Sequence, residues 1–560
     1  MSMATADQTP NVVLTGFMGT GKSVVGQRVA ARLGRPFVDM DLEIERRAGR
    51  SIRDIFAQEG EEAFRRLEAA LCRELARKQG LVIATGGGAL TFDGNRRALG
   101  ETGLLICLTA SVDEILRRLD NAHDRPLLAT PDRRARIEAL LERRAAAYAA
   151  IPHQIDTTGL TPDQVAERVI ALATPAILPV RAPAGSYDIL LGPGLLAELG
   201  RHLRARGLRG PVAVVTNTTV GPLYGERAVQ ALRRAGYAAT LLSIPDGEAH
   251  KTPETVRKLY DRFAAARLER QSTVVALGGG VVGDVVGFAA ATYLRGVPLV
   301  QAPTTLLAMV DASVGGKVGV DLPQGKNLVG AFKQPALVVA DTETLATLPP
   351  AEWRAGLAEV VKHGLIGAPA LLERLEQGEE RQAEGWLAEA IRVKVAVVEE
   401  DPFEAGRRAV LNLGHTFAHA IEQATGYGWR HGDAVAVGLV AACHLSAARG
   451  DCTDALTERR ESLLRRLGLP VRATGLDPMS LYRAMSTDKK RRGGRLRFVL
   501  VRAPGDVFVA DNVPTDAVQA TLRWLTEGGQ GKGYRLRPVT ASTCACNSSN
   551  EGRGPNSSGG

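Results

Sequence analysis

Two glycine-rich loops in different halves of the 560-residue chain most constrain how it can fold. The first, Gly16 to Ser23, fits the pattern G-x-x-x-x-G-K-[ST], whereas the second, Gly278 to Asp284, has closely spaced glycines but no lysine. In the first pattern, backbone amides surround phosphate oxygens, the lysine reaches the outer phosphates and the hydroxyl binds Mg²⁺. We expect the second loop to hold a differently used nucleotide, so the sequence predicts two separate chemistries on one polypeptide.

The length of the chain exceeds what one hydrophobic core organises, and about 150 residues per domain predicts three or four domains. A content of 45% hydrophobic and 23% charged residues is typical of a soluble globular protein. No uninterrupted apolar run reaches the roughly 18 residues that cross a bilayer, and the first ten residues lack a signal-peptide pattern. We therefore expect a cytoplasmic protein without a membrane partner.

The net charge of +9 comes from 70 basic and 61 acidic residues that are dispersed along the chain. Phosphorylated small molecules explain this excess more simply than nucleic acid does. The six cysteines are scattered, which argues against a disulfide framework. Cys544 and Cys546 could bind metal, but they lie in a segment rich in Ser, Asn and Gly, so we interpret them as part of a disordered tail over 528–560.

The order of apolar runs and helical patterns indicates four structured or linking regions. Short apolar runs alternate with helical patterns over 1–174, which predicts a parallel sheet with flanking helices. Prolines without helical period over 175–186 predict a semi-rigid linker. The α/β rhythm resumes over 187–348, and helical patterns dominate 349–527, where we expect an all-helical domain.

The first glycine loop follows an apolar strand and opens a helix, which is the context of a phosphate-binding loop. Asp39 and Asp41 follow Phe37-Val38, so we expect one strand to carry both carboxylates on one face at its carboxyl end. One carboxylate could serve Mg²⁺ and the other a substrate hydroxyl. Considered singly, an Asp-x-Asp pair is more often a solvated strand end, and single arginines are more often surface charges.

The second loop also lies between a predicted strand and a helix, where small residues and the helix N-terminus favour a pyrophosphate, although a tight turn is the alternative. Upstream, Glu248 could accept hydrogen bonds from ribose hydroxyls. His415 and His419 share one face of a predicted helix, and His431 follows after a turn. Spacing alone favours a zinc site with His415, His419 and one further ligand.

In order and spacing, the motifs of roughly residues 8 to 174 resemble shikimate kinase. The motifs are Gly16 to Ser23, Phe37-x-Asp39-x-Asp41, Phe64-Arg65-Arg66-Leu67-Glu68, Gly86-Gly87-Gly88, Arg125-Pro-Leu-Leu and Arg144-x-x-x-Tyr148. The resemblance implies that ATP with Mg²⁺ is bound by Gly19, Thr20, Gly21, Lys22 and Ser23, with Asp39 completing the metal site.

The same resemblance assigns the substrate side of the kinase site. It implies that Asp41 orients the shikimate hydroxyls, that Arg65 and Arg144 hold the carboxylate, and that Gly87 and Gly88 approach the ring. It also implies that Lys22 and Arg125, the latter on a lid, are catalytic and stabilise charge at the transferring phosphoryl group. A pair of guanidinium groups suits a carboxylate, and phosphoryl transfer depends mostly on positioning and electrostatics.

Roughly residues 187 to 527 resemble 3-dehydroquinate synthase. The matching stretches are Pro245 to Lys251, Gly278 to Asp284, Pro303 to Leu307, Gly315-Gly-Lys317, Gly325-Lys326-Asn327, Ala358-Glu359-x-x-Lys362, Asn412-x-Gly-His415 and His431-Gly432. The resemblance implies a two-domain synthase, with an NAD-binding α/β domain followed by the helical domain, and a homodimer. It replaces the zinc ligands expected from spacing by Glu359, His415 and His431, which leave an open coordination position for Zn²⁺ or Co²⁺.

The resemblance to the synthase also implies three groups of site residues. NAD⁺ is expected at Glu248, Lys251, Gly279, Gly280, Asp284, Thr304, Thr305, Lys317 and Lys326. The heptulosonate phosphate is expected at Arg295, Asp311, Lys317, Asn327, Lys394, Glu404, Arg408, Asn412 and Lys489. Catalytic roles are expected for Lys317, Lys362, Arg408 and His419, the last as the residue that handles protons near neutral pH. The family usually has hydroxyl residues where this chain has Ala312 and Val318, which could shift substrate affinity.

Together the resemblances imply a bifunctional enzyme of chorismate biosynthesis that acts on shikimate and on the heptulosonate phosphate. These two reactions are not consecutive, so channelling between the sites is not implied. A second hypothesis keeps the folds but joins another small-molecule kinase to a polyol dehydrogenase or sugar-phosphate cyclase; Arg65 with Arg144, and Lys317 with Arg408, favour the anionic substrates instead. A third, a non-catalytic scaffold, predicts loss of reactive residues, whereas Lys22, Glu359 and His415 are intact.

Overall fold

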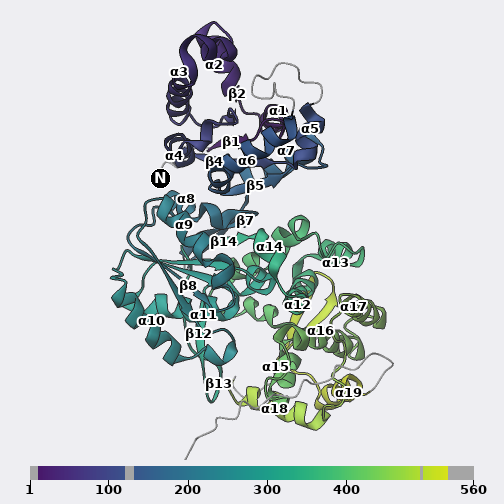
Figure 1. The fold of residues 1–560 in the computed structure, drawn as a ribbon. Helices are drawn as coiled ribbons and strands as arrows, with labels where there is room; N and C mark the ends of the chain where they lie inside the picture. Colours follow the sequence, from purple (N-terminus) through teal and green to yellow (C-terminus); the bar gives the residue numbers. More distant parts are fainter. Residues whose placement is uncertain (1–9, 120–131, 184, 492–495, 528–560) are drawn as a thin grey trace, which may run out of the picture. The chain divides into compact units, whose positions relative to one another are not determined.

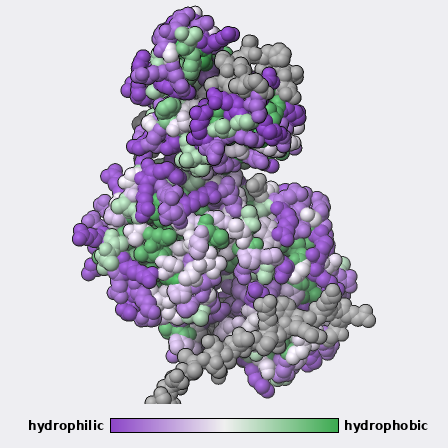
Figure 2. All heavy atoms as spheres, in the orientation of Figure 1, coloured by the Kyte–Doolittle hydropathy of each residue, from purple (hydrophilic) through white to green (hydrophobic). Residues whose placement is uncertain are grey.

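The computed structural model describes residues 10–119, 132–183, 185–491 and 496–527, without the side chains of 384 and 486–491 (Figure 1). The chain forms two compact units, Met1–Leu411 and Asn412–Gly560. The first unit contains two separate, mostly parallel sheets with their helices, and the second is mainly helical. Figure 2 shows a face covered largely by hydrophilic residues, with hydrophobic ones in small groups.

The N-terminal sheet has five parallel strands in the order β2-β3-β1-β4-β5, as predicted for this region. The strands are β1 (Asn11–Gly16), β2 (Phe37–Asp39), β3 (Val82–Ala84), β4 (Gly103–Thr109) and β5 (His153–Asp156). The helices are α1 (Lys22–Leu33), α2 (Met40–Ala48), α3 (Ile52–Leu75), α4 (Asp93–Thr102), α5 (Val112–Leu119), α6 (Arg133–Ala149) and α7 (Pro162–Ala173). β1 is buried along its whole length between two hydrophobic clusters, which is typical of a central parallel strand.

The second sheet of the first unit has the order β6-β7-β14-β11-β10-β8-β9, and only its edge strand β6 runs antiparallel to its neighbour. The strands are β6 (Ala176–Ala182), β7 (Gly185–Gly192), β8 (Val212–Asn217), β9 (Ala239–Ile244), β10 (Thr273–Gly278), β11 (Leu299–Pro303) and β14 (Leu337–Asp341), with a separate hairpin of β12 (Lys317–Leu322) and β13 (Gly325–Phe332). The helices are α8 (Leu199–Ala205), α9 (Glu226–Arg234), α10 (Pro253–Ala265), α11 (Gly280–Thr292), α12 (Pro350–Gly367), α13 (Pro369–Glu376) and α14 (Ala383–Glu400).

The segment 175–186, predicted as a linker, is mostly strand β6 and the turn into β7, so this prediction was wrong. Leu178, Val180 and Ala182 are buried, while the residues between them are exposed. This alternation is the pattern of a strand with one buried face. Its prolines obscured the pattern, but Pro179 is tolerated because β6 lies at the edge of the sheet, where a missing N–H costs little.

The second unit packs helices around one long apolar helix and a small hairpin. The elements are α15 (His415–Ala424), α16 (His431–Ala448), α17 (Asp454–Arg466), α18 (Pro478–Arg491), β15 (Phe498–Ala503), β16 (Asp506–Ala510) and α19 (Thr515–Thr526). By length and composition α16 could cross a membrane, but 78% of it is buried in the structure, as in a core helix. The β15–β16 hairpin corrects the expectation that 349–527 is all-helical; its residues Phe498 to Val501 are buried. The tail 528–560, with Cys544 and Cys546, lies outside the described residues.

Candidate active sites

The first glycine loop joins the carboxyl end of β1 to the start of α1. Gly16 has φ 133°, and a Cβ there would lie 2.1 Å from the carbonyl oxygen of Leu108, so only glycine fits. The Lys22 ammonium donates to the carbonyl oxygens of Gly16 (2.9 Å) and Phe17 (3.0 Å). The Ser23 hydroxyl donates to Asp39 Oδ2 at 2.6 Å. A lysine, a hydroxyl and a carboxylate therefore meet at one edge of the sheet.

Asp39 and Asp41 do not share a strand face, which corrects the prediction. Strand β2 ends at Asp39, whose side chain caps α2 by accepting hydrogen bonds from the backbone N–H groups of Asp41 (3.1 Å) and Leu42 (3.4 Å). Asp is a favoured N-cap residue, and this cap starts the helix before Asp41. Both carboxylates still line the same cavity.

Arg65 on α3 is held by two carboxylates. Its guanidinium forms ion pairs with Glu68 (2.7 Å) and Glu61 (3.0 Å). Glu68 is 1% exposed; burial raises its pKa, and Arg65 only partly offsets this. A Cβ added to Gly88 would lie 3.0 Å from Arg65 Nη2. Glu68 was not predicted as a site residue, although its i,i+3 spacing from Arg65 on one helix could have indicated it.

Arg144 on α6 reaches the same glycine turn. Its Nη1 donates to the carbonyl oxygen of Gly87 at 3.2 Å, and the Tyr148 hydroxyl donates to the same oxygen at 2.7 Å. A cavity of about 830 Å³ brings together the predicted kinase residues of the described region. They are Gly19, Thr20, Gly21, Lys22, Ser23, Asp39, Asp41, Arg65, Gly87, Gly88 and Arg144. Arg125 lies outside the described residues.

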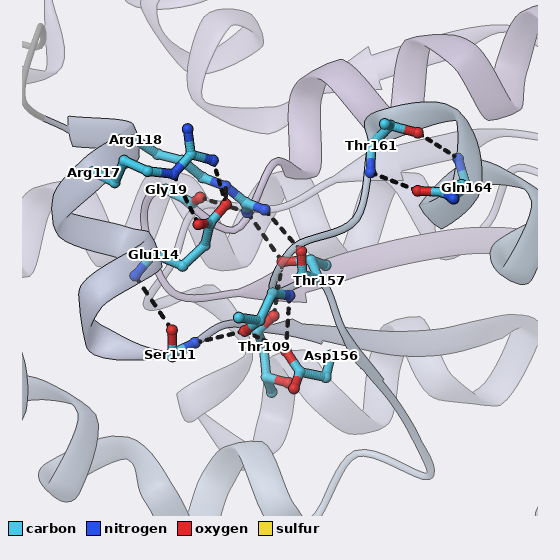
Figure 3. A network of polar contacts seen from close by, with 11 residues as sticks. Gly19, Thr109, Ser111, Glu114, Arg117, Arg118, Asp156, Thr157, Thr161 and Gln164 are labelled. Carbon is cyan, nitrogen blue, oxygen red and sulfur yellow. Dashed lines mark hydrogen bonds and ion pairs between the residues drawn. The ribbon is translucent and has the colours of Figure 1, made fainter.

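Arg118 on α5 also lines this cavity and was missed from the sequence. Figure 3 shows it between the glycine loop and the segment after β5. Its guanidinium donates to the carbonyl oxygens of Gly19 (3.2 Å) and Thr157 (2.8 Å), and its Nε pairs with Glu114 at 2.7 Å. The Ser111 hydroxyl caps α5 by accepting from the backbone N–H of Glu114 at 3.2 Å, but no motif of the sequence includes Arg118.

The second glycine loop joins β10 to α11 in the first unit. Lys251 pairs with Asp284 at 2.6 Å, and Lys326 pairs with Glu248 at 3.4 Å. Burial lowers the pKa of Lys251, but the carboxylate of Asp284 more than offsets this and raises it.

Small residues of this loop lie against the strand and turn that follow α11. A Cβ on Gly279 would lie 3.2 Å from the Thr305 methyl group, and one on Gly280 would lie 3.4 Å from Ala312. The Thr304 N–H donates to the carbonyl oxygen of Gly278 at 3.0 Å. These contacts place Thr304 and Thr305 beside Gly279 and Gly280 at the start of α11.

Charged residues predicted to bind substrate form ion pairs with one another in the first unit. Lys317 pairs with Glu404, and Lys394 pairs with Asp311. Burial alone would raise the pKa of Asp311, but Lys394 and Lys362 hold it well below its usual range. Arg295 lies in the turn Tyr293–Arg295, Asn327 in β13, and Asn412 at the end of Arg407–Asn412; the side chain of Lys489 is not described.

Arg408 is almost fully buried, and its guanidinium donates to the carbonyl oxygens of Pro402 (2.6 Å) and Gly315 (3.0 Å). The carboxylate of Glu359 pairs with the Lys362 ammonium one turn along α12, and both are buried. Val318 is also buried and packs against Gly287 of α11. Where the family usually has a hydroxyl residue, this chain therefore has an apolar side chain that packs in the interior.

Three histidines gather in the second unit. The ring of His415 lies 5.3 Å from that of His431 and 5.5 Å from that of His419. His415 Nδ1 lies 3.2 Å from the carbonyl oxygen of Leu413, and His431 Nδ1 lies 3.4 Å from Glu422 Oε1. Such partners orient an imidazole and leave its other nitrogen for a metal. Glu422 was not predicted, although its position seven residues after His415 places it on the same side of α15.

Comparison with known proteins gives matches over both halves of the chain. The shikimate kinase family matches residues 18–174, and the N-terminal and C-terminal families of 3-dehydroquinate synthase match 241–355 and 356–491. The 3-dehydroquinate synthase of Pelobacter propionicus is 48% identical over 344 residues, which are 60% of this chain and 96% of that protein.

Two solved structures resemble the synthase half. The first is 2-epi-5-epi-valiolone synthase from Streptomyces hygroscopicus subsp. jinggangensis 5008 with NAD⁺ and Zn²⁺, 32% identical, covering 61% of this chain and 97% of that chain, with a TM-score of 0.57. The second is 2-deoxy-scyllo-inosose synthase with carbaglucose-6-phosphate, NAD⁺ and Co²⁺, 27% identical, covering 62% and 100%, also with a TM-score of 0.57.

The fold and both sites therefore define a bifunctional enzyme, with a P-loop kinase part followed by a synthase part of the nucleotide- and metal-dependent kind. The chain belongs to the 3-dehydroquinate synthase family, and its N-terminal part carries a shikimate kinase domain. The identity of 48% to a 3-dehydroquinate synthase exceeds that to either cyclase structure, which favours this family over the sugar-phosphate cyclases considered from the sequence.

Proposed function

We propose that the chain phosphorylates shikimate with ATP at one site and converts the heptulosonate phosphate to 3-dehydroquinate and phosphate at the other. The observation that carries this is the match of both families in one chain that covers 96% of a known 3-dehydroquinate synthase. The charged residues that each anionic substrate requires are present at both sites. The substrates are small molecules, and we place the reactions in the cytoplasm, on a homodimer formed through the synthase part.

At the kinase site, the donors fit ATP with Mg²⁺. The ion prefers oxygen ligands, which the Ser23 hydroxyl and the Asp39 carboxylate supply within 2.6 Å of each other. When bound, ATP supplies the phosphoryl group and Mg²⁺ neutralises its oxygens. Lys22 stabilises the negative charge that moves during transfer, and Asp41 orients the accepting hydroxyl. Arg65 and Arg144 hold the carboxylate against Gly87 and Gly88.

At the synthase site, Glu359, His415 and His431 are residues that could hold a metal ion, each offering one ligand atom. One carboxylate oxygen and two imidazole nitrogens fit Zn²⁺ or Co²⁺ and leave a position for substrate. The chemistry that NAD⁺ and the metal supply when bound is reversible hydride transfer and polarisation of an oxygen at the reacting carbon. Lys317, Lys394 and Arg408 bind the phosphate and carboxylate, and His419 exchanges protons with the substrate.

The test is to assay both activities on one purified protein supplied with NAD⁺ and Zn²⁺: ADP formation with shikimate, and phosphate release from the heptulosonate phosphate. Lys22→Ala should abolish only the first activity, and His415→Ala only the second. Each variant thus serves as the folding control for the other. A folded wild type that releases no phosphate would refute the synthase assignment, and loss of both activities in either folded variant would refute two independent sites.

A further inference from the structure

A buried tyrosine of β7, the second strand after the kinase domain, contacts the loop before Lys317 of the synthase. Tyr187 lies in β7 and is 1% exposed. Its hydroxyl oxygen accepts a hydrogen bond from the backbone N–H of Gly315 at 3.1 Å. Gly315 precedes Gly316 and Lys317, and all three belong to the stretch predicted to bind substrate and cofactor. The side chain therefore reaches the loop without belonging to any motif.

The backbone of Gly315 is held through the peptide groups on both sides of its Cα. Its carbonyl oxygen accepts a hydrogen bond from the Arg408 guanidinium at 3.0 Å, while its N–H donates a hydrogen bond to the Tyr187 hydroxyl oxygen. Gly315 has φ 91°, and a Cβ there would lie 2.5 Å from Arg408 Nη2 and 2.8 Å from the Val398 side chain. Only glycine fits at this place, so Gly315 has no side chain that could fix its own backbone.

The loop and Arg408 are both connected to further charged residues of the synthase site. Lys317 begins β12 and pairs with Glu404, which lies four residues before Arg408. The backbone N–H of Arg408 donates to Asp401 Oδ2 at 2.9 Å. The position of the Gly315 peptide therefore influences where the charges of both Lys317 and Arg408 lie.

We propose that Tyr187 is a positioning residue of the synthase, whose hydroxyl fixes the Gly315 peptide and thereby the Arg408 guanidinium and the Lys317 ammonium for an anionic substrate. This inference rests on the proposed function, because it takes Arg408 and Lys317 as substrate-binding residues. Without the hydroxyl, the buried N–H of Gly315 loses its partner, and a buried unpaired donor is unfavourable enough for the loop to rearrange. A small displacement of binding residues weakens substrate binding strongly.

The test compares Tyr187→Phe with Tyr224→Phe in the full chain. Tyr224 is a matched control, because it is also buried in the same unit and its hydroxyl bonds to Thr347 (2.5 Å) and to the carbonyl oxygen of Thr344 (3.3 Å). Both variants lose one buried hydroxyl and should lower the melting temperature similarly. Tyr187→Phe should raise KM for the heptulosonate phosphate about tenfold, as loss of one hydrogen bond to a binding loop predicts.

Three further measurements separate positioning from a loss of stability. The kcat of the synthase should change less than KM in Tyr187→Phe, and the kinase activity should stay at the wild-type value. Tyr224→Phe should leave both constants unchanged. An unchanged KM in Tyr187→Phe, or equal changes in the two variants, would overturn the inference. A wild type without phosphate release would instead refute the proposed function, and the two failures are therefore distinct.

Discussion

At the scale of single residues, Gly88 shows how a substrate-binding side chain of the kinase site depends on the absence of a neighbouring one. A Cβ there would lie 3.0 and 3.1 Å from the two terminal nitrogens of Arg65. The guanidinium is the end of a flexible side chain, so it can move and stability should change little. We predict that Gly88→Ala raises KM for shikimate roughly tenfold, the equivalent of about 1.5 kcal/mol for one charge-assisted hydrogen bond.

Gly94→Ala is the matched control for this prediction, because a Cβ at Gly94 would meet no atom within 4 Å. Steady-state kinetics with varied shikimate should show no change in that variant, and phosphate release by the synthase part should be normal in both. Equal KM values for the Gly88→Ala variant and the wild type would show that Arg65 does not need its present position to bind the carboxylate.

Residues that act through a motif could be predicted from the sequence, and residues that act through three-dimensional neighbours could not. Lys22 and Ser23 follow from a loop whose chemistry is local. Arg118 lines the same cavity, but it depends on a contact to Thr157, 39 residues away, whereas Glu68 pairs with Arg65 of its own helix. Tyr187 is the extreme case, with its partner Gly315 128 residues away in the chain.

At the scale of elements, β6 shows why a strand within a proline-rich segment escapes prediction and how its role can be tested. Val180 is fully buried on β6, whereas Ile177 of the same strand is 54% exposed. We predict that Val180→Ala destabilises the synthase part by about 2 kcal/mol, because removal of buried methyl groups leaves a cavity. Ile177→Ala should change stability by less than about 0.5 kcal/mol, as is usual for surface positions. Thermal inactivation of phosphate release measures both; equal effects would instead suit the linker that the sequence predicted.

The segment from Asp401 to Arg408 is a second element whose stability can be tested, here through pH. Burial acts to raise the pKa of Asp401, but backbone N–H groups of Arg408, Gly406 and Ala405 outweigh this and hold it below its ordinary value of 3.8. Because the folded pKa is lowered, the carboxylate stabilises the fold above its ordinary pKa and loses this contribution as pH falls through the lower value.

We predict that Asp401→Asn is less stable than the wild type near neutral pH and that this difference shrinks below about pH 4. Urea unfolding followed by tryptophan fluorescence at both pH values measures the difference. Glu269→Gln is a suitable control, since its side chain is exposed and its carboxylate forms no ion pair with the other described residues. A difference between wild type and Asp401→Asn that is constant with pH would contradict a stabilising role of the charge.

Elements with a regular period were predicted well, and those that depend on pairing partners were not. β1, β4, β8 and β10 are buried apolar runs between helices, and their order in the sequence indicates parallel sheets. The hairpin β15–β16 is short, and Phe498 to Val501 of β15 form a continuous apolar run without alternation, which periodicity cannot distinguish from a buried helical segment. Asp39 caps α2 and thereby moved Asp41 from the predicted strand into a helix.

At the scale of the whole molecule, two metal requirements of different chemistry are combined in one chain. Ser23 and Asp39 offer oxygen ligands, which suit Mg²⁺, whereas Glu359, His415 and His431 include two imidazoles, which suit Zn²⁺ or Co²⁺. We predict that chelation of the full-length protein abolishes both activities. Subsequent addition of excess Mg²⁺ should restore only ADP formation with shikimate, and phosphate release should return only when Zn²⁺ or Co²⁺ is also added.

The variant His415→Ala provides the control for this experiment, because its kinase activity should respond to Mg²⁺ like that of the wild type while added Zn²⁺ restores no phosphate release. Recovery of the synthase with Mg²⁺ alone would contradict the assignment of the imidazoles as ligands, since Mg²⁺ prefers oxygen donors. Separate recovery also bears on why the two parts are joined. The two reactions are not consecutive, so neither site receives its substrate from the other. Each site binds its own metal ion and substrate, and for this reason Mg²⁺ and Zn²⁺ or Co²⁺ should restore the two activities one at a time.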